Sequence, residues 1–561
     1  MITAKSGFKV NMTHKLPWFL LLVFVITKLL WHGFSTPFVD VHWDSVIHLY
    51  QAKLFSETAF IQNYAQQASA IAAEVTRPWV NNDWPEHYWH FGRLGHIVLL
   101  GTVVKIFGSG AEGIVAAHWL HHILMALTMV FAVLCVTTLV NYLDTERSQQ
   151  VVLWSAVGSA VLYMISNIYA YMGRCLVSEG PTLLLLTIAV LLLITGLKRQ
   201  SVFWSCCSGF FAFLTHSFRL ESIWLYIAFC IVLAAMLWIR RGSMQWLRAY
   251  ACAGSVAFAC YLLYAWYFYP LTNPYLFILF AKSQPPWRGG IPIYMHISVA
   301  GGLLWTGVFV SIIAASCWTT ARMALAWVGT ALLPSIPYFL QNLSLSPPYR
   351  MQLQTRMLVI ILFLPLLFSS TLGWAYVWEY RKRGLSSIFF AVVSLTVLLI
   401  ALSSARLSML PGLREIRYVR TFLMVPAGEQ TTYQFDEWHR ISQVLYSQNN
   451  PVFLVFDWDS LRHEENLDLL RFFAPAYSPQ TNPLNDVGAF QCEERMPTLP
   501  TPEKVSYCFG MTPDRLQRLT ERGVTVFSLT SISKSHDTTM PFAYREVLCT
   551  QNYRLELIKP L

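Results

Sequence analysis

Residues 181–241 read PTLLLLTIAVLLLITGLKRQSVFWSCCSGFFAFLTHSFRLESIWLYIAFCIVLAAMLWIRR. This stretch holds three apolar runs, each long enough to cross the hydrocarbon core of a bilayer, which takes roughly 17–25 residues in a helix. The basic pairs Lys198-Arg199 and Arg240-Arg241 follow the first and the third run. Long apolar runs joined by short basic turns predict a polytopic α-helical membrane protein.

The composition of the whole chain agrees with this prediction. Hydrophobic residues make up 55% of the 561 residues and charged residues 12%, and the mean hydropathy is +0.45. An ordinary globular chain has about 25% charged residues. A soluble enzyme, a disordered chain, a collagen-like chain and a small disulfide-rich protein are therefore excluded.

Apolar runs of spanning length recur through the first 410 residues, so we predict about eleven spans. One further apolar run, from Leu94 to Phe107, is only about 14 residues long, which predicts an interfacial or re-entrant helix. When this run is left out of the count, every basic turn falls on one side, and the positive-inside rule makes that side and the N-terminus cytoplasmic. The predicted spans are residues 16–34, 113–140, 150–172, 181–197, 201–218, 221–239, 250–268, 294–318, 323–341, 357–378 and 385–404.

Charge divides the chain into two parts. Residues 1–410 contain 25 Lys and Arg against 12 Asp and Glu, whereas residues 411–561 contain 15 against 18. On a membrane chain such a basic excess sets the orientation, so we expect no nucleic-acid partner. We predict a transmembrane domain over 1–410 with an external loop at 35–93, and a soluble extracytoplasmic domain over 411–561.

The C-terminal part alternates strand and helix patterns, which predicts a small α/β domain with a mostly parallel sheet. No glycine-rich phosphate loop opens either helix, so nucleotide binding is not expected. An oxidising compartment would permit one disulfide, for which Cys492 and Cys508 are the first candidates. The predicted strands are 451–456, 505–509, 524–528 and 553–558, and the predicted helices are 435–448 and 513–522.

A group of arginines stands at span ends on the predicted outer side, where the positive-inside rule does not place them. An anionic ligand at the outer face would explain them, because arginine makes bidentate contacts with phosphate. The alternative is pairing with nearby carboxylates, of Arg219 with Glu221 and of Arg174 with Glu179. The group consists of Arg174, Arg219, Arg288, Arg350 and Arg356.

Two further groups have the residue types of a metal site. The histidines of one apolar span have no carboxylate beside them, so we predict that they are buried and hydrogen-bonded. A second group shares a polar external loop, and a substrate-facing loop without metal is favoured there over a metal cluster. The histidines are His118, His121 and His122, and the loop residues are Asp83, Glu86, His87 and His90.

Four motifs follow one another on the predicted outer side. In the first, Asp44 precedes His48 and Ala52 at intervals of four residues, and Asp40 is a second carboxylate. The others are WPEHYWHFGRL at 84–94, RCLVSEGP at 174–181, and Pro348-Tyr349-Arg350 with Arg356. Taken in this order, the motifs resemble the GT-C superfamily of membrane glycosyltransferases, which includes protein O-mannosyltransferases and aminoarabinose transferases.

The resemblance implies an inverting transfer of a sugar from a polyprenyl-phosphate-linked donor to a lipid, glycan or protein acceptor. The reaction would take place on the outer face of a plasma membrane, such as the bacterial inner membrane. The resemblance implies Asp44 as the general base, with Asp40 as the runner-up. It implies no certain cofactor: some members use a divalent cation, but Ser45 stands here where a second acidic residue is common. The donor phosphate would be bound by Arg93, Arg174, Arg219, Arg350 and Arg356, and the substrate loop would be formed by His48, Glu86, His87, Tyr88 and Glu179.

The same chemistry can be argued from the residue types. Transfer from a lipid phosphate needs a base for the acceptor, cations for the departing phosphate and a membrane groove for the lipid. Two alternatives stay open at this point. Asp44 could be a helix N-cap, and the chain could be a transporter or flippase for a lipid-linked or anionic solute.

Overall fold

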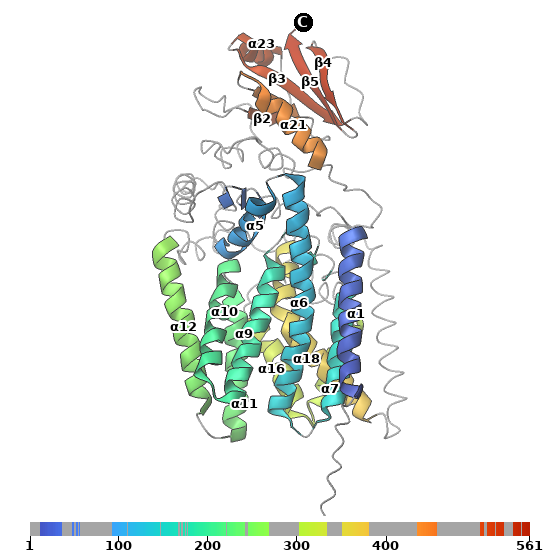
Figure 1. Cartoon of the computed structure of the whole chain (residues 1–561), viewed down its shortest axis with the longest axis vertical. Coiled ribbons are helices and arrows are strands. Elements are labelled where there is room, and N and C mark those ends of the chain that lie inside the picture. The colour runs from blue at the N-terminus through green and yellow to red at the C-terminus, as the bar shows by residue number, and fades with distance from the viewer. Residues whose placement is uncertain are drawn as a thin grey trace, which may run out of the picture.

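The computed structural model has a long bundle of helices and, beyond one end of it, a small sheet (Figure 1). This sheet is C-terminal, as the change in charge and hydropathy predicts. The structure describes residues 12–35, 48–49, 52–53, 55–56, 93–108, 110–145, 147–166, 169, 172–173, 176, 178–219, 222–241, 245–268, 302–333, 351–380, 435–450, 452–456, 505–509, 513–521, 523–531, 542–550 and 553–560.

The helices of the bundle overlap the predicted spans, although α7, α15 and α16 differ from them by several residues at one or both ends. The predicted run at 385–404 lies outside the described residues. Among the described helices, α6, α9, α11, α12 and α18 are long and apolar enough to cross a membrane. The chain is therefore an integral membrane protein, and the total of about eleven spans stays a prediction. The bundle helices are α1 (Met12–Ser35), α6 (Ala111–Leu143), α7 (Gln149–Met164), α9 (Glu179–Arg199), α10 (Val202–Phe218), α11 (Ser222–Arg241), α12 (Gln245–Phe268), α15 (Gly302–Ala314), α16 (Thr319–Leu332) and α18 (Met351–Tyr380).

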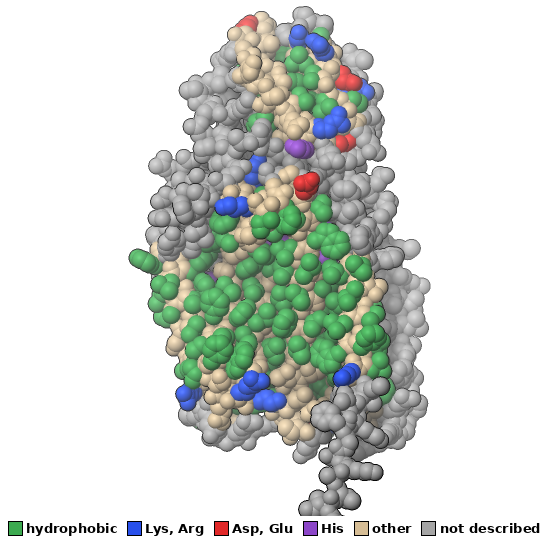
Figure 2. Space-filling model, in the orientation of Figure 1, with side chains coloured by type: hydrophobic (Ala, Val, Ile, Leu, Met, Phe, Trp, Pro, Cys, Tyr) green, Lys and Arg blue, Asp and Glu red, His purple; other side chains and the backbone are tan. Residues whose placement is uncertain are grey.

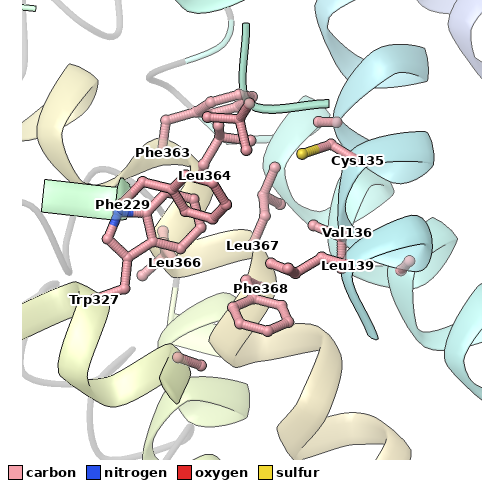
Figure 3. Packing of buried hydrophobic residues seen from close by; sticks show 14 of the residues in the cluster. Cys135, Val136, Leu139, Phe229, Trp327, Phe363, Leu364, Leu366, Leu367 and Phe368 are labelled. Carbon is pink, nitrogen blue, oxygen red and sulfur yellow. The ribbon is translucent and has the colours of Figure 1, made fainter. Parts of the chain in front are cut away.

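Helix α18 lies in the centre of this bundle. In its most apolar stretch 83% of the residues are buried, against 11% in α12, so α12 turns most of its side chains outward to lipid. Figure 3 shows the aromatic and leucine side chains of α18 packed against α6 and α16. The ring of Phe368 lies 6.3 Å from that of Trp327 on α16.

Small residues allow two pairs of helices to approach closely. A Cβ atom at Gly373 of α18 would overlap the carbonyl oxygen of Gly307 on α15, and one at Gly209 of α10 would overlap that of Ala253 on α12. Such crossings are typical of membrane helices, which associate through close packing because lipid is as apolar as their side chains.

The short apolar run is a separate helix, α5 (Leu94–Phe107), with the predicted bounds. Near its start, the His96 ring lies 5.5 Å from His121 of α6, and just beyond its end Gly108 packs against Gly113 of α6. These two positions on α6 are eight residues apart, or about 12 Å along the helix. Because a bilayer core is about 30 Å thick, this extent agrees with the prediction that α5 does not cross it.

The end of the bundle away from α5 carries an ion-pair network around Arg147. Its guanidinium lies 3.2 Å from Asp144 and 2.7 Å from Glu379, and stacks 3.7 Å from the centre of the Trp318 ring. Three helix connections therefore meet at one end, as the alternating topology predicts. Figure 2 shows Lys and Arg side chains at this lower end, below a broad hydrophobic belt.

The C-terminal sheet has the strand order β2-β1-β3-β5-β4. The first three of these strands are parallel, but β5 is antiparallel to both β3 and β4, so the sheet is mixed where we predicted a mostly parallel one. The sequence prediction missed β4 because its side chains are largely exposed and give no buried pattern. The strands are β1 (Val452–Phe456), β2 (Val505–Phe509), β3 (Thr525–Ser531), β4 (Phe542–Cys549) and β5 (Tyr553–Pro560).

Two helices cover opposite faces of this sheet, at the predicted positions. Helix α21 (Phe435–Ser447) packs on the face that carries Leu454 and Phe527, and α23 (Pro513–Glu521) on the face that carries Val455 and Val526. Neighbouring strand residues point to opposite faces, which explains the alternation. Within the sheet Cys508 pairs with Val455 of β1, whereas Cys492 lies outside the described residues, so the predicted disulfide stays untested.

The buried apolar side chains of α21 and the sheet belong to the same cluster as those of α5 and the start of α6. We call this group the junction cluster. It joins the C-terminal domain to the end of the bundle that carries α5. Its members include Leu49, Leu100, Val104, Ile114, Leu176, Trp438, Ile441, Leu445 and Phe527.

Candidate functional site

A buried ion pair stands at the α5 end of the bundle. Glu179 is the first residue of α9, Arg219 directly follows α10, and the guanidinium lies 2.5 Å from the carboxylate. Both side chains are at most 2% exposed. Because α9 and α10 are antiparallel neighbours, the start of one meets the end of the other. The alternative in the sequence analysis pairs Arg219 with Glu221 and Arg174 with Glu179. The structure shows Arg219 in contact with Glu179, while Glu221 and Arg174 lie outside the described residues.

A carbonyl oxygen close to this pair accepts two histidine hydrogen bonds. His48 Nδ1 lies 3.3 Å, and His96 Nε2 3.2 Å, from the backbone oxygen of Leu176. Both histidines are fully buried, and their rings touch edge to face with centroids 4.7 Å apart. The Leu176 carbonyl oxygen thus joins three segments of the chain: the stretch after the first span, helix α5, and the turn before α9.

His96 is surrounded by charged and titratable groups. Burial, followed by the nearby His121 and Arg93, lowers the pKa of His96 to about 3, although Glu179 acts in the opposite direction. Desolvation disfavours the protonated ring, so His96 is neutral at physiological pH. Its Nδ1 atom is buried and has no hydrogen-bond partner among the residues that the structure describes.

The start of α5 is fixed against the end of α10. A Cβ atom at Gly95 would lie 2.5 Å from Ser217 Oγ and 2.6 Å from the ring of Phe218. Only glycine fits this contact, which places Arg93 and His96 beside the α10 end that carries Arg219. Arg93 is 9% exposed and directly precedes the helix.

The three histidines of α6 are buried and hydrogen-bonded, as predicted. His121 Nδ1 lies 3.0 Å from the carbonyl oxygen of Ala117, and the Nε2 atoms of His118 and His122 are 3.1 Å apart. In the part of the chain that the structure describes, no three His, Cys, Asp or Glu side chains form a group that could hold a metal ion.

The structure brings together four residues that the sequence analysis named for the site: His48, Arg93, Glu179 and Arg219. Arg356 lies in α18, but its side chain is outside the described residues. Sequence reasoning missed His96, although a histidine inside an apolar 14-residue helix is a polar exception that could have identified it. The other predicted site residues lie outside the described residues: Asp40, Asp44, Glu86, His87, Tyr88, Arg174 and Arg350.

No family model and no curated protein sequence matches this chain. Two crystal structures of ArnT from Cupriavidus metallidurans, one bound to undecaprenyl phosphate and one in the apo state, do match in fold. Each has a TM-score of 0.50 and 12% identity, over 96% of this chain and 97% of the ArnT chain. The protein therefore has the GT-C-like fold of ArnT.

Proposed function

We propose that the protein is a membrane glycosyltransferase that moves a sugar from a polyprenyl-phosphate-linked donor to a lipid, glycan or protein acceptor. The ArnT-like fold supports this, since one matching ArnT structure is bound to undecaprenyl phosphate. The observation that carries the proposal is the gathering of buried His48, Arg93, His96, Glu179 and Arg219 at one end of the bundle. A transporter would favour ionisable groups near the middle of the membrane.

In this proposal Asp44 is the general base, with Asp40 as the second candidate. Four residues of chain reach at most about 14 Å, so a base at Asp44 would act within that distance of His48. The carboxylate takes the proton of the acceptor hydroxyl while the hydroxyl oxygen bonds to the anomeric carbon. The bond from that carbon to the phosphate oxygen breaks, and the lipid phosphate leaves with the electron pair, which inverts the configuration.

Cationic side chains would stabilise the charge that develops on the departing phosphate. Of the two described arginines, Arg219 already contacts the carboxylate of Glu179, and Arg93 directly precedes α5 beside it. For Arg219 to bind phosphate it would have to share its guanidinium with Glu179. The full proposed set is Arg93, Arg174, Arg219, Arg350 and Arg356.

We assign catalysis to residues 1–410, with the loop at 35–93 as part of the substrate site. Residues 411–561 would form an extracytoplasmic domain over the same face. The junction cluster supports this assignment, because it packs α21 of the C-terminal domain into the same apolar group as α5 at the candidate site.

The proposal can be tested with purified protein in liposomes that contain an undecaprenyl-phosphate-linked labelled sugar. We expect transfer by the native chain, no transfer by Asp44→Asn, and retained transfer by Asp40→Asn, with all three proteins equally stable. Asn is a good helix N-cap, so a capping role for Asp44 would leave the Asp44→Asn protein active. Activity in that variant, combined with loss in Asp40→Asn, would move the base to Asp40.

A further inference from the structure

The hydrogen bonds to Leu176 fix where the protons of His48 and His96 stand. A carbonyl oxygen can only accept, so each ring must direct an N–H toward it. His48 therefore donates from Nδ1 at 3.3 Å and His96 from Nε2 at 3.2 Å. A carbonyl oxygen has two lone pairs, so it can hold both bonds at once.

This arrangement leaves His96 Nδ1 as an acceptor with a lone pair. The ring is neutral because burial and the neighbouring His121 and Arg93 keep its pKa far below neutral pH, with Glu179 opposing them. A neutral imidazole that donates from Nε2 has no proton on Nδ1. Backbone geometry thus selects the tautomer, and the free lone pair follows from it.

That lone pair is buried and has no partner in the described part of the chain. Leaving a buried acceptor unpaired costs about 1–3 kcal/mol, so folded proteins rarely do so without a reason. His96 also lies within electrostatic range of Arg93 and Glu179, two residues of the candidate site. An unpaired acceptor at this place can take a hydrogen bond from a bound group.

We propose that His96 Nδ1 accepts a hydrogen bond from a hydroxyl group of the donor's sugar, an inference that rests on the proposed glycosyltransferase function. A lone pair repels a phosphate oxygen but attracts a hydroxyl proton. The phosphate would be held by Arg93, three residues earlier in the chain. Since the sugar is bonded directly to that phosphate, its ring hydroxyls are the nearest donors.

Two amide variants separate the two nitrogen atoms of His96. His96→Gln can still carry an N–H to the Leu176 carbonyl but has no acceptor at the Nδ1 position. His96→Asn has an oxygen at the Nδ1 position but cannot reach the carbonyl. Each purified full-length protein is titrated with undecaprenyl phosphate, undecaprenyl-phosphate glucose and undecaprenyl-phosphate aminoarabinose, and dissociation constants are compared.

We expect the native protein to bind at least one sugar-bearing lipid more tightly than undecaprenyl phosphate. In His96→Gln this preference should fall by about 5- to 100-fold, with undecaprenyl phosphate binding unchanged, whereas His96→Asn should keep it. Equal weakening for all three lipids in His96→Gln would reduce His96 to a positioning residue and overturn the inference. Unchanged dissociation constants for all three lipids in His96→Gln would mean that Nδ1 is hydrogen-bonded to a buried water, which would also overturn the inference.

Failure of the proposed function gives a different result. In that case the native protein would transfer no label from either sugar donor, whatever the binding preference of the variants. If His96→Asn lost the preference for the sugar-bearing lipid over undecaprenyl phosphate, this would also count against the inference. Either variant alone therefore tests the inference if the other fails to fold.

Discussion

Glu179 and Arg219 form a buried ion pair with a 2.5 Å contact, although 40 residues separate them in the sequence. Breaking a buried ion pair by removing one of its partners typically costs about 3–5 kcal/mol. We therefore expect Glu179→Gln and Arg219→Gln each to lower the free energy of unfolding in detergent by about this amount. The double variant should recover part of the loss because it removes both charges of this pair. Additive losses would show that the two charges do not depend on each other.

The fit of α5 against α10 predicts a strong effect of one methyl group. Gly95→Ala places a Cβ atom against Ser217 and Phe218, and we expect it to lower the free energy of unfolding by about 1–3 kcal/mol. Gly158→Ala in α7 is the matched control, since a Cβ atom there meets nothing within 4 Å. The control should leave stability unchanged or raise it by up to about 1 kcal/mol. Equal effects of the two changes would contradict the close contact.

Arg147 at the opposite end combines stacking with two carboxylate contacts, and lysine cannot reproduce both. The site is partly exposed, so we expect Arg147→Lys to cost only about 1 kcal/mol in thermal or denaturant unfolding. Arg199→Lys is the control, because Arg199 lies 5.9 Å from the Trp204 ring and has no carboxylate partner in the described ranges. If Arg199→Lys lost as much stability as Arg147→Lys, the loss could not be attributed to the ion-pair network around Arg147.

Two exposed cysteines report the orientation of the chain. Cys317 lies beside Trp318 at the Arg147 end of the bundle, and Cys549 ends strand β4 of the C-terminal sheet. In single-cysteine variants expressed in bacterial cells, a membrane-impermeant maleimide should label Cys549 in intact spheroplasts. Cys317 should react only after the membrane is permeabilised. The reverse pattern would invert the proposed topology.

Tyr553 should make the stability of the C-terminal domain depend on alkaline pH. Burial, together with Glu437, raises the pKa of Tyr553 above its ordinary value of 10. The folded state thus favours the neutral phenol, and its contribution is complete below pH 10 and is lost as pH rises through the folded pKa. The native chain should therefore lose stability relative to Tyr553→Phe as pH rises above 10. A constant difference from pH 8 upward would refute this.

Much of the fold could be predicted because membrane helices obey strong local rules. Length and the side of the basic turns predicted α5 as a separate helix with the observed bounds, and 14 apolar residues are too few for a bilayer core. The helices α21 and α23 were predicted to within one residue at each end. Strand β4 was not predicted, because an exposed edge strand lacks the alternation of apolar and polar residues on which strand prediction depends.

The candidate site was harder to predict because its contacts join distant segments. Motif order suggested His48, Arg93, Glu179 and Arg219, and the alternative for the charges was pairing with their sequence neighbours. The contact of Arg219 with Glu179 follows from the antiparallel packing of α9 and α10, which no local pattern encodes. His96 was missed for the same reason, since its role depends on a carbonyl oxygen 80 residues away.

The junction cluster also affects how the chain is made. Phe435, where α21 begins, is synthesised 328 residues after Phe107, where α5 ends. Until α21 has been synthesised and the C-terminal domain has folded, the apolar side chains of α5 and α6 in this cluster cannot pack against that domain. The C-terminal domain therefore completes an apolar surface that is synthesised much earlier, and a chain truncated before residue 435 would expose that surface to proteases and aggregation.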